Sequence, residues 1–420
     1  MILFPLFRPA MRPLLVGLGL FIAASLAHAD DAPRFRTDAA GPASVKKPAN
    51  GKGKFDAPEW FQLVPGKFPP AGSAHAMSGE LIRSDHLERR FQIRVDRDDS
   101  QDRGIWDLPL DATMLPYGAI HYHGSPAALQ DIPLGTHLRG QFYLKDPNDK
   151  SPLPDTAYNR KTPDFEFRRC FLLEDDFTFH ARQGQLWKIE SVDLATMKLA
   201  ATLQADGKAI GQSKTFDLLT STRVMQGAGF GELKSLQAGQ GVLFNLTWGT
   251  LYGPGRITDI WLDEPARAFA TAQQLERHRN HVRERGLPGW VEAVDDEAQV
   301  VTITFFGGVD QKLFDELTLT SSNKVGWPLA KEADNPAAPK GTIAVARDSL
   351  MTYDPVNDRK GGNILDIKKI PAEPGGAGVQ IKVKCDLLLE GFRPKRIVRF
   401  YPATWKVMAL PREEQFYGRE

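Results

Sequence analysis

The chain has 420 residues, of which 53 are Lys or Arg and 52 are Asp or Glu, so its formal net charge is +1. A charge this close to neutral gives no general attraction to nucleic acid, which is therefore not expected as a partner. The length suits two or three domains, each large enough to bury its own core. The two cysteines, Cys170 and Cys385, fall in predicted strands of different repeats, and two separate buried thiols are favoured over a disulfide between them.

Residues 1–29 have the pattern of a cleavable secretory signal. Arg8 and Arg12 precede an apolar run over residues 14–27, and Ala27 and Ala29 form a small-residue cleavage site. The run is too short to span a bilayer comfortably, so no stable membrane insertion is expected after cleavage. Removing the segment takes away two arginines and no acidic residue, which leaves a mature chain of charge −1. The predicted location is periplasmic or extracellular.

Residues 30–77 are rich in Ala, Pro, Gly and Lys, with few apolar residues before Phe55, Trp60 and Phe61. A segment of this composition buries too little surface to offset the entropy of ordering it. It is predicted to be a flexible leader whose aromatic end docks on the first domain.

The rest of the chain is organised as three copies of one unit. Gly79, Gly184 and Gly289 are spaced by 105 residues, and each begins a strand-like segment. A second strand with period-two alternation follows in every copy, over residues 91–95, 197–203 and 301–305. Such alternation is typical of antiparallel sheet with one buried and one solvated face. Third strands are predicted at residues 106–114, 214–224 and 313–321, fourth strands at 138–144, 242–248 and 379–387, and fifth strands at 169–173, 256–262 and 396–400.

A short helix is predicted between the third and fourth strands of the first copy, with Ser125 as its cap, Pro126 in its first turn and Gly135 at its end. Five strands with a helix in this place match an OB-type barrel. The predicted fold is mainly β, with three tandem OB-like five-stranded barrels at residues 78–180, 181–263 and 287–410, the last with an insertion, and a tail at 411–420. A set of small β-sandwiches is the alternative.

One α-helix is predicted to link the second and third barrels over residues 264–286. Asp263 is its candidate N-cap, Pro265 lies in its first turn, and Gly286 ends it. Its last part, residues 277–285, is basic and includes His278 and His281. Positive charge complements the helix dipole at this end, so a solvated basic face is expected.

Three histidines are the candidates for a metal site. His121 and His123 are at positions i and i+2 of a predicted strand, which places both on one face, and His137 follows downstream. Such a set suits the three ligands of a catalytic zinc, and it defines the alternative function, a metal-dependent hydrolase. The other two copies offer no histidines in this region, so the sequence favours a protein that is not an enzyme and has no cofactor.

Aromatic residues of the second copy are the candidates for ligand contact. Trp187, Tyr252 and Trp261 are predicted to form stacking platforms, because small barrels of this kind bind extended polymers across one sheet face and its loops. The predicted function is a secreted, non-enzymatic binding or scaffolding protein of the bacterial cell envelope, with a glycan or a protein as partner. A structural role without a ligand is a third option.

Four short motifs support this organisation: residues 115–118 (Leu-Pro-Tyr-Gly), 121–124 (His-Tyr-His-Gly), 131–136 (Asp-Ile-Pro-Leu-Gly-Thr) and 259–263 (Asp-Ile-Trp-Leu-Asp). In these motifs the chain resembles uncharacterised secreted bacterial proteins built from tandem OB-like β-barrel repeats. The resemblance covers most of residues 78–405. It implies an architecture and brings no activity with it.

We expect signal cleavage after Ala29, because the small-residue site follows the apolar run directly. Mass spectrometry of the exported protein should find a chain that begins at Asp30. Exported protein that still begins at Met1 would contradict the secretory prediction.

Overall fold

The computed structural model describes residues 63–64, 66–96, 109–143, 168–247, 255–319, 341–347, 350–351, 360–407 and 410–411. The predicted signal segment, most of the predicted leader, Tyr252 and residues 412–420 lie outside the described residues. None of the helices in the described ranges has the length and apolar character needed to cross a membrane.

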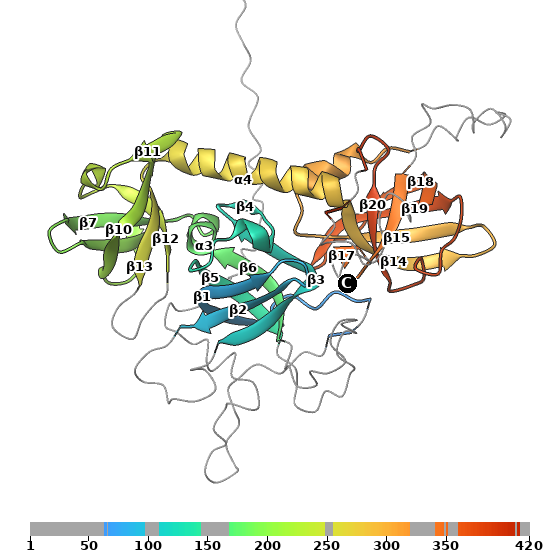
Figure 1. The fold of residues 1–420 in the computed structure, drawn as a ribbon, viewed down its shortest axis with the longest axis horizontal. Coiled ribbons are helices and arrows are strands. Elements are labelled where there is room, and N and C mark those ends of the chain that lie inside the picture. The colour runs from blue at the N-terminus through green and yellow to red at the C-terminus, as the bar shows by residue number, and fades with distance from the viewer. Residues whose placement is uncertain are drawn as a thin grey trace, which may run out of the picture. The chain divides into compact units, whose positions relative to one another are not determined.

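Barrel 1 is a closed five-stranded sheet with a short added strand (Figure 1). Its elements are β1 (His75–Asp85), β2 (Arg90–Val95), β3 (Leu110–Tyr122), β4 (Ser125–Pro126), the 3-10 turn η2 (Leu129–Asp131), β5 (His137–Tyr143) and β6 (Arg168–Asp175). The sheet order is β2-β1-β5-β6-β3-β4, and β2 also pairs with β3 to close the barrel. The β3 and β6 strands run parallel, while the other pairs are antiparallel.

Barrel 2 repeats this topology. It follows the helix α3 (Asp176–Arg182) and contains β7 (Gln185–Asp193), β8 (Lys198–Ala205), β9 (Lys208–Ala209), β10 (Lys214–Gln226), β11 (Gly229–Gly231), η3 (Leu233–Ser235), β12 (Gly241–Leu246) and β13 (Arg256–Trp261). Its main strands, β7, β8, β10, β12 and β13, pair as their counterparts do in barrel 1, with β10 parallel to β13. The two barrels are therefore copies of one OB-like unit.

Barrel 3 is closed by six strands, one more than predicted. Its elements are β14 (Leu287–Asp295), β15 (Val300–Phe306), η4 (Gln311–Glu316), β16 (Gly341–Arg347), β17 (Leu350–Met351), β18 (Lys360–Lys369), β19 (Gly376–Cys385) and β20 (Ile397–Tyr401). Its order is β17-β16-β18-β19-β15-β14-β20, closed between β16 and β20, and its paired strands are antiparallel. The mainly β fold with three barrels and one linking helix is confirmed.

The first hairpin is the element that the three barrels share most closely. The first strand of each ends on an aspartate whose carboxylate accepts a backbone N–H from the turn: Asp85, Asp193 and Asp295. Four residues later, each turn contains a residue with φ between 51° and 53°: Arg89, Met197 and Gln299. These aspartates are spaced by 108 residues (193 − 85) and 102 residues (295 − 193). The unit is repeated, but its period is not constant.

Of the three glycines spaced by 105 residues, Gly79 and Gly289 share one structural cause and Gly184 has another. Gly79 and Gly289 lie two residues before the bulge of their first strand, where an added Cβ would come within 2.2 Å and 2.6 Å of backbone oxygens on the neighbouring strand. The same register position in barrel 2 is held by Trp187. Gly184 lies three residues earlier, in the turn after α3, with φ 66°. The third glycine is therefore not equivalent to the other two.

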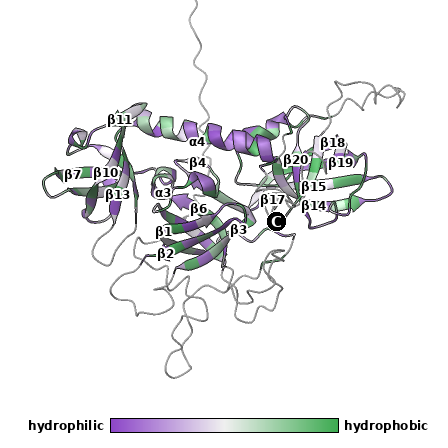
Figure 2. Cartoon of the chain, in the orientation of Figure 1, coloured by the Kyte–Doolittle hydropathy of each residue, from purple (hydrophilic) through white to green (hydrophobic). Residues whose placement is uncertain are grey.

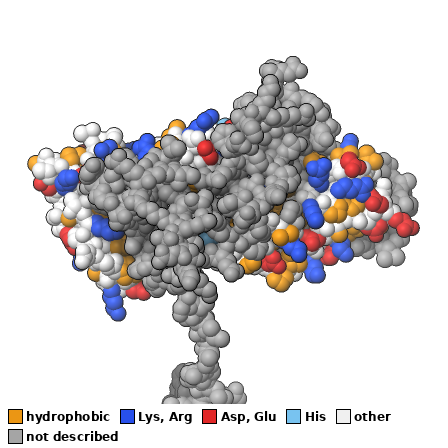
Figure 3. All heavy atoms as spheres, turned by 90° about the horizontal axis from the view of Figure 1, so that it is seen from below, with side chains coloured by type: hydrophobic (Ala, Val, Ile, Leu, Met, Phe, Trp, Pro, Cys, Tyr) orange, Lys and Arg blue, Asp and Glu red, His pale blue; other side chains and the backbone are white. Residues whose placement is uncertain are grey.

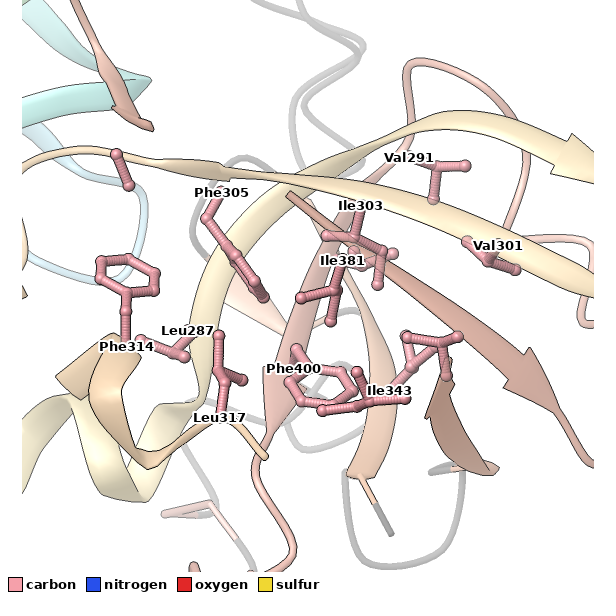
Figure 4. Packing of buried hydrophobic residues seen from close by; sticks show 14 of the residues in the cluster. Leu287, Val291, Val301, Ile303, Phe305, Phe314, Leu317, Ile343, Ile381 and Phe400 are labelled. Carbon is pink, nitrogen blue, oxygen red and sulfur yellow. The ribbon is translucent and has the colours of Figure 1, made fainter. Parts of the chain in front are cut away.

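Each barrel encloses its own cluster of buried apolar side chains. Hydrophobic and hydrophilic residues alternate along the strands, and α4 (Glu264–Arg285) is mainly hydrophilic toward its C-terminal end (Figure 2). In barrel 3, Phe305, Ile381 and Phe400 point into one core from three strands (Figure 4). Cys170 and Cys385 are free and buried in the cores of barrels 1 and 3, as predicted.

A fourth apolar cluster includes a residue from the predicted leader. Phe68 stacks on Trp290 of barrel 3, with ring centroids 4.4 Å apart, and meets Tyr117 of barrel 1 edge-on at 5.5 Å. Phe68, near the end of the predicted leader, therefore contacts two barrels. Phe55, Trp60 and Phe61, the residues named from the sequence, lie outside the described residues.

The linking helix α4 begins and ends as its sequence predicts. The carboxylate of Asp263 accepts the N–H of Ala266 at 2.8 Å, and Gly286, with φ 81°, donates its own N–H to the carbonyl of Val282 at 2.7 Å. A polar N-cap and a C-terminal glycine satisfy backbone groups that the helix itself leaves unpaired.

Two local predictions are wrong. Residues 313–316, the first part of the third strand predicted for the last copy, belong to the 3-10 turn η4, which Asp310 caps and which buries Leu313 and Phe314 in the core. The third strand of this barrel is β16 instead. In barrel 1, Ser125 belongs to β4, and the predicted helix is only the single turn η2, which begins after Ala128.

Helix α3 was not predicted, and it joins barrels 1 and 2. Asp175 caps it by accepting the N–H of Thr178 at 3.0 Å. The fully buried Asp175 carboxylate also accepts an N–H of the side-chain amide of Asn245, from β12, at 2.8 Å. The side-chain oxygen of Asn245 accepts the backbone N–H of Phe177 at 2.8 Å. One asparagine of barrel 2 therefore satisfies both the cap and the first turn of α3.

We expect Asn245→Ala to lower the free energy of unfolding by about 3 kcal/mol, because it removes a partner from a buried carboxylate and from a buried N–H. Urea denaturation would measure this. The matched control is Asn363→Ala in barrel 3, where the amide oxygen has no hydrogen-bond partner within the described part of the chain, and a change of about 0.5 kcal/mol is expected. Equal losses in the two variants would contradict the role given to Asn245.

Candidate functional site

An open groove of about 900 Å³ lies along the N-terminal half of α4. Its other walls come from the β3–β4 turn, from α3, and from the edges of β7 and β12. Segments of barrels 1 and 2 therefore face the linking helix across one space. A volume of this size is in the range of ligand-binding clefts.

The α4 wall of the groove is a single helical stripe. Its residues recur three and four positions apart, as one face of an α-helix requires: Glu264, Arg267, Ala268, Thr271, Ala272 and Leu275. Ala268 and Ala272 are exposed, and their side chains are too small to fill the middle of the groove. The stripe is adjacent to a buried one formed by residues 266, 270, 274, 278 and 282.

Hydrogen bonds fix α4 to the β3–β4 turn at the groove. The Thr271 hydroxyl donates to the carbonyl of His123 at 2.7 Å, and the Ser125 hydroxyl donates to the carbonyl of Thr271 at 2.9 Å. The Gln274 amide reaches the Asp131 carboxylate at 3.0 Å. The position of this wall relative to barrel 1 is therefore set by specific polar contacts.

Apolar residues contribute to the groove where the strands β7 and β12 of barrel 2 are no longer paired. Strands β7 and β12 pair only between Trp187–Lys188 and Gly241–Val242. The next residues on the two strands, Leu186 and Leu243, line the groove together with Phe177 of α3. Leu243 and Phe177 are only 1% and 2% exposed, so the partly buried Leu186 provides most of the apolar contact on this side.

An ion pair between Arg182 and Glu174 lies at the end of the groove next to barrel 1. Arg182 binds the buried carboxylate of Glu174 with two hydrogen bonds of 2.9 Å, and His121 Nδ1 lies 3.9 Å from the same carboxylate. Burial raises the pKa of Glu174, but the hydrogen bonds and charges of His121 and Arg182 outweigh it and lower the pKa. The carboxylate is therefore ionised at neutral pH and holds Arg182 at the groove.

The predicted stacking residues lie elsewhere. Trp187 is in the core of barrel 2, 5% exposed, where it stacks on Phe244 with centroids 5.3 Å apart. Trp261 is 2% exposed and packs edge-on against Phe177 at 4.7 Å. Both rings are covered by other side chains and present no face to a ligand, and Tyr252 lies outside the described residues.

His121 and His123 do not lie on one strand face. Strand β3 ends at Tyr122, and His123 follows in a turn with φ 52°, so the i and i+2 relation of a strand does not hold. Its ring stacks on Tyr122 at 3.7 Å and meets Trp261 at 4.8 Å. Burial first, and then the charges of Arg223 and Arg277, lower the pKa of His123 to about 3, so the ring is neutral.

His137 is held between two carboxylates. Its Nδ1 lies 2.8 Å from Asp176 and its Nε2 lies 2.7 Å from Asp96. Burial lowers the pKa of His137, but the two carboxylates outweigh burial and raise it to about 10. The doubly hydrogen-bonded imidazolium ties strand β5 to α3, and neither ring nitrogen is left for a metal. Among the described residues, no group of three or more His, Cys, Asp or Glu side chains is placed to hold a metal ion.

The solvated basic face expected at the end of α4 is wrong for its histidines. His278 is 4% exposed and accepts the N–H of Asp310 through Nε2 at 3.3 Å. His281 is partly buried and lines a second cavity with Arg285. The helical spacing of positions 278, 281, 282 and 285 on one face was a signal that could have identified this wall.

The chain matches no protein-family model, and no curated protein is significantly similar to it in sequence. The resemblance to secreted proteins with OB-like repeats therefore stays a prediction. The candidate site rests on the geometry of the groove alone.

We expect the stability of the protein to fall at alkaline pH through His137. Its pKa is about 6.5 in the unfolded chain and about 10 in the fold, so its contribution is complete below about pH 6.5 and is lost as the pH rises toward 10. Urea denaturation across this range should show a loss up to about 5 kcal/mol larger in the parent protein than in His137→Gln. Parallel curves would show that His137 is not charged in the fold.

Proposed function

We propose that this chain is an exported, non-enzymatic binding protein of the bacterial cell envelope that holds an extended polymer, with a glycan as the ligand class, in the groove beside α4. The observation that supports this best is the groove itself, about 900 Å³ in volume, which polar and apolar side chains line together. Sugar units present hydroxyl groups at their edges and C–H groups on their faces, and such a lining suits both.

The polar groups of the groove are of the kind that orient a ligand. Arg182, Arg267 and Gln185 provide donors, and Glu264 provides an acceptor. Arg267 is braced by Glu264 at 3.0 Å and by the carbonyl of Gly241 at 3.4 Å. Braced side chains lose less conformational entropy when a ligand binds, which favours affinity.

The charge state of the groove favours binding over acid catalysis. Glu174 has a lowered pKa and is engaged by Arg182, so it is not a proton donor at neutral pH. The described side chains on the face seen in Figure 3 mix basic and acidic groups without a large patch of one sign. Recognition by the shape and local polarity of one groove fits this surface better than long-range attraction to a polyelectrolyte.

We expect Ala268→Trp to weaken glycan binding by about tenfold or more, because an indole placed on the low wall of α4 fills the groove. Isothermal titration with soluble peptidoglycan fragments and with neutral and anionic oligosaccharides would measure the affinity. The matched control is Gln273→Trp, an exposed position on the same helix that does not line the groove. Equal affinity in the two variants, for a glycan that the parent protein binds, would place the binding site elsewhere.

A further inference from the structure

The β10–β11 hairpin of barrel 2 presents an aromatic ring at the edge of its sheet. Strand β11 is an outer strand of this sheet, so one of its sides has no neighbouring strand in the described part of the chain (Figure 1). Phe230 is the middle residue of β11, between Gly229 and Gly231, and is 78% exposed. No other large apolar residue in the described ranges is as exposed. This edge is separate from the groove and does not depend on the function proposed for the groove.

Phe230 is the end of an apolar row on the outer face of barrel 2. The row crosses four neighbouring strands, β12, β13, β10 and β11, through paired positions: Leu243, Trp261, Met225 and Phe230. Side chains paired across strands project from the same face of a sheet. The first three pack under α3 and α4 in one apolar cluster. The ring of Phe230 therefore continues this row beyond the cover of the helices.

The backbone of Phe230 directs its hydrogen-bonding groups toward the open edge. The hairpin turns through residues 227–228 and is closed by the pair Gln226 and Gly229. Antiparallel strands alternate pairs that are hydrogen-bonded to each other with pairs that are not, and the pair that closes a two-residue turn is hydrogen-bonded. The next pair, Met225 and Phe230, is therefore not. The N–H and C=O of Phe230 point away from β10, and no backbone partner for them is found among the described residues.

Two other edge strands of the described barrels have features that prevent further pairing. Strand β9, at the opposite edge of the same sheet, contains Lys208. Strand β4 of barrel 1 contains Pro126 and is bound to α4 through the Gln274 amide. Lysine and proline on an edge strand oppose pairing with another molecule. Strand β11 has neither, and a Cβ added at Gly229 would meet no atom within 4 Å, so another backbone can approach it.

The hairpin is fixed in place before any partner binds. The N–H of Gly227 lies 3.1 Å and 3.2 Å from the two carboxylate oxygens of Asp263. Asp263 is also the N-cap of α4, so the turn is bound to the start of the helix. A strand that is already ordered loses little conformational entropy when it pairs, which favours association.

A second copy of β11 is complementary to this edge. When two such strands pair antiparallel about a two-fold axis at Phe230, the N–H of each Phe230 meets the C=O of the other. Both rings then lie on one face as a cross-strand aromatic pair, which is stabilising. The same register places Glu232 opposite Ala228 of the other copy, so no like charges oppose each other.

We propose that this chain forms a dimer in which β11 pairs with β11 of a second copy, with Phe230 at the two-fold axis. The sheets of the two barrel 2 units then continue into each other. Only three residues of each copy pair, so the interface is smaller than the roughly 1,200 Å² buried in stable complexes. The dimer is therefore weak, with a dissociation constant on the order of 100 µM.

Sedimentation velocity of the full chain from about 5 to about 500 µM tests this, because these concentrations lie on both sides of the expected constant. We expect the average mass to rise from monomer toward dimer. Phe230→Lys should raise the dissociation constant by about tenfold or more, because it places two like charges opposite each other at the axis. The matched control is Leu194→Lys, which changes a 41% exposed residue of the β7–β8 turn in the same way, with an expected change within about twofold.

A mixture of two variants tests the register itself. Phe230→Lys and Phe230→Glu should each remain monomeric alone, since each places a charge opposite its own copy. An equimolar mixture at low salt should associate about tenfold more tightly than either variant, because opposite charges then meet at the axis. The exposure of Phe230 makes both replacements compatible with the fold, which circular dichroism would verify.

A parent chain that stays monomeric up to about 500 µM would overturn the proposal. So would equal weakening of the dimer by Leu194→Lys and Phe230→Lys, or a mixture that associates no better than its components. A monomeric parent that loses glycan affinity on Phe230→Lys would assign the ring to a ligand and rule out the dimer.

Discussion

Two adjacent buried carboxylates, Asp175 and Asp176, determine how barrels 1 and 2 are joined. Asp175 caps α3 and receives the amide of Asn245 from barrel 2, while Asp176 binds His137 and Arg139 from barrel 1. Burial raises the pKa of the first to about 6, whereas the imidazolium and the guanidinium outweigh burial and lower the pKa of the second. A pair of acids this deeply buried is tolerated because donors from both barrels surround it. The α3 wall of the groove takes its position from these contacts.

Helix α4 extends this organisation because different parts of its surface have different roles. Its N-cap, Asp263, also accepts the N–H of Gly227, so the start of the helix is fixed to the β10–β11 hairpin. One stripe of the helix is buried, the stripe beside it forms the wall of the groove over residues 264–275, and the C-terminal turns line the smaller cavity, in part through His278 and Val282 of the buried stripe. A helix with so little apolar surface depends on polar contacts such as Gln274 with Asp131 and Arg279 with Asp310. The same contacts hold the groove and the cavity open.

The features that the sequence predicted correctly are those set by local chemistry. Alternating residues identified most strands, and Asp263 with Gly286 identified the ends of α4, because period, cap and C-terminal glycine are readable within a few residues. Two predictions failed because residues far along the chain determine the local structure: the strand predicted at residues 313–321 and the missed helix α3. The apolar residues of η4 pack into a core built from β14 to β20, and α3 depends on Asn245, 70 residues beyond its cap. His123 was misplaced because a turn with φ 52° ends its strand one residue earlier.

The groove and the smaller cavity show why composition limited the functional prediction. A net charge of +1 argues against a long polyanion as ligand, since attraction over such distances depends on the sum of many charges. Screening restricts exposed charges to a range of about 8 Å at physiological salt, so a small ligand responds to the few groups around it. The element around each arginine of the smaller cavity explains its presence locally: a hairpin for Arg89, a helix end for Arg285 and a strand for Arg399. Only the tertiary structure brings these three side chains to one cavity.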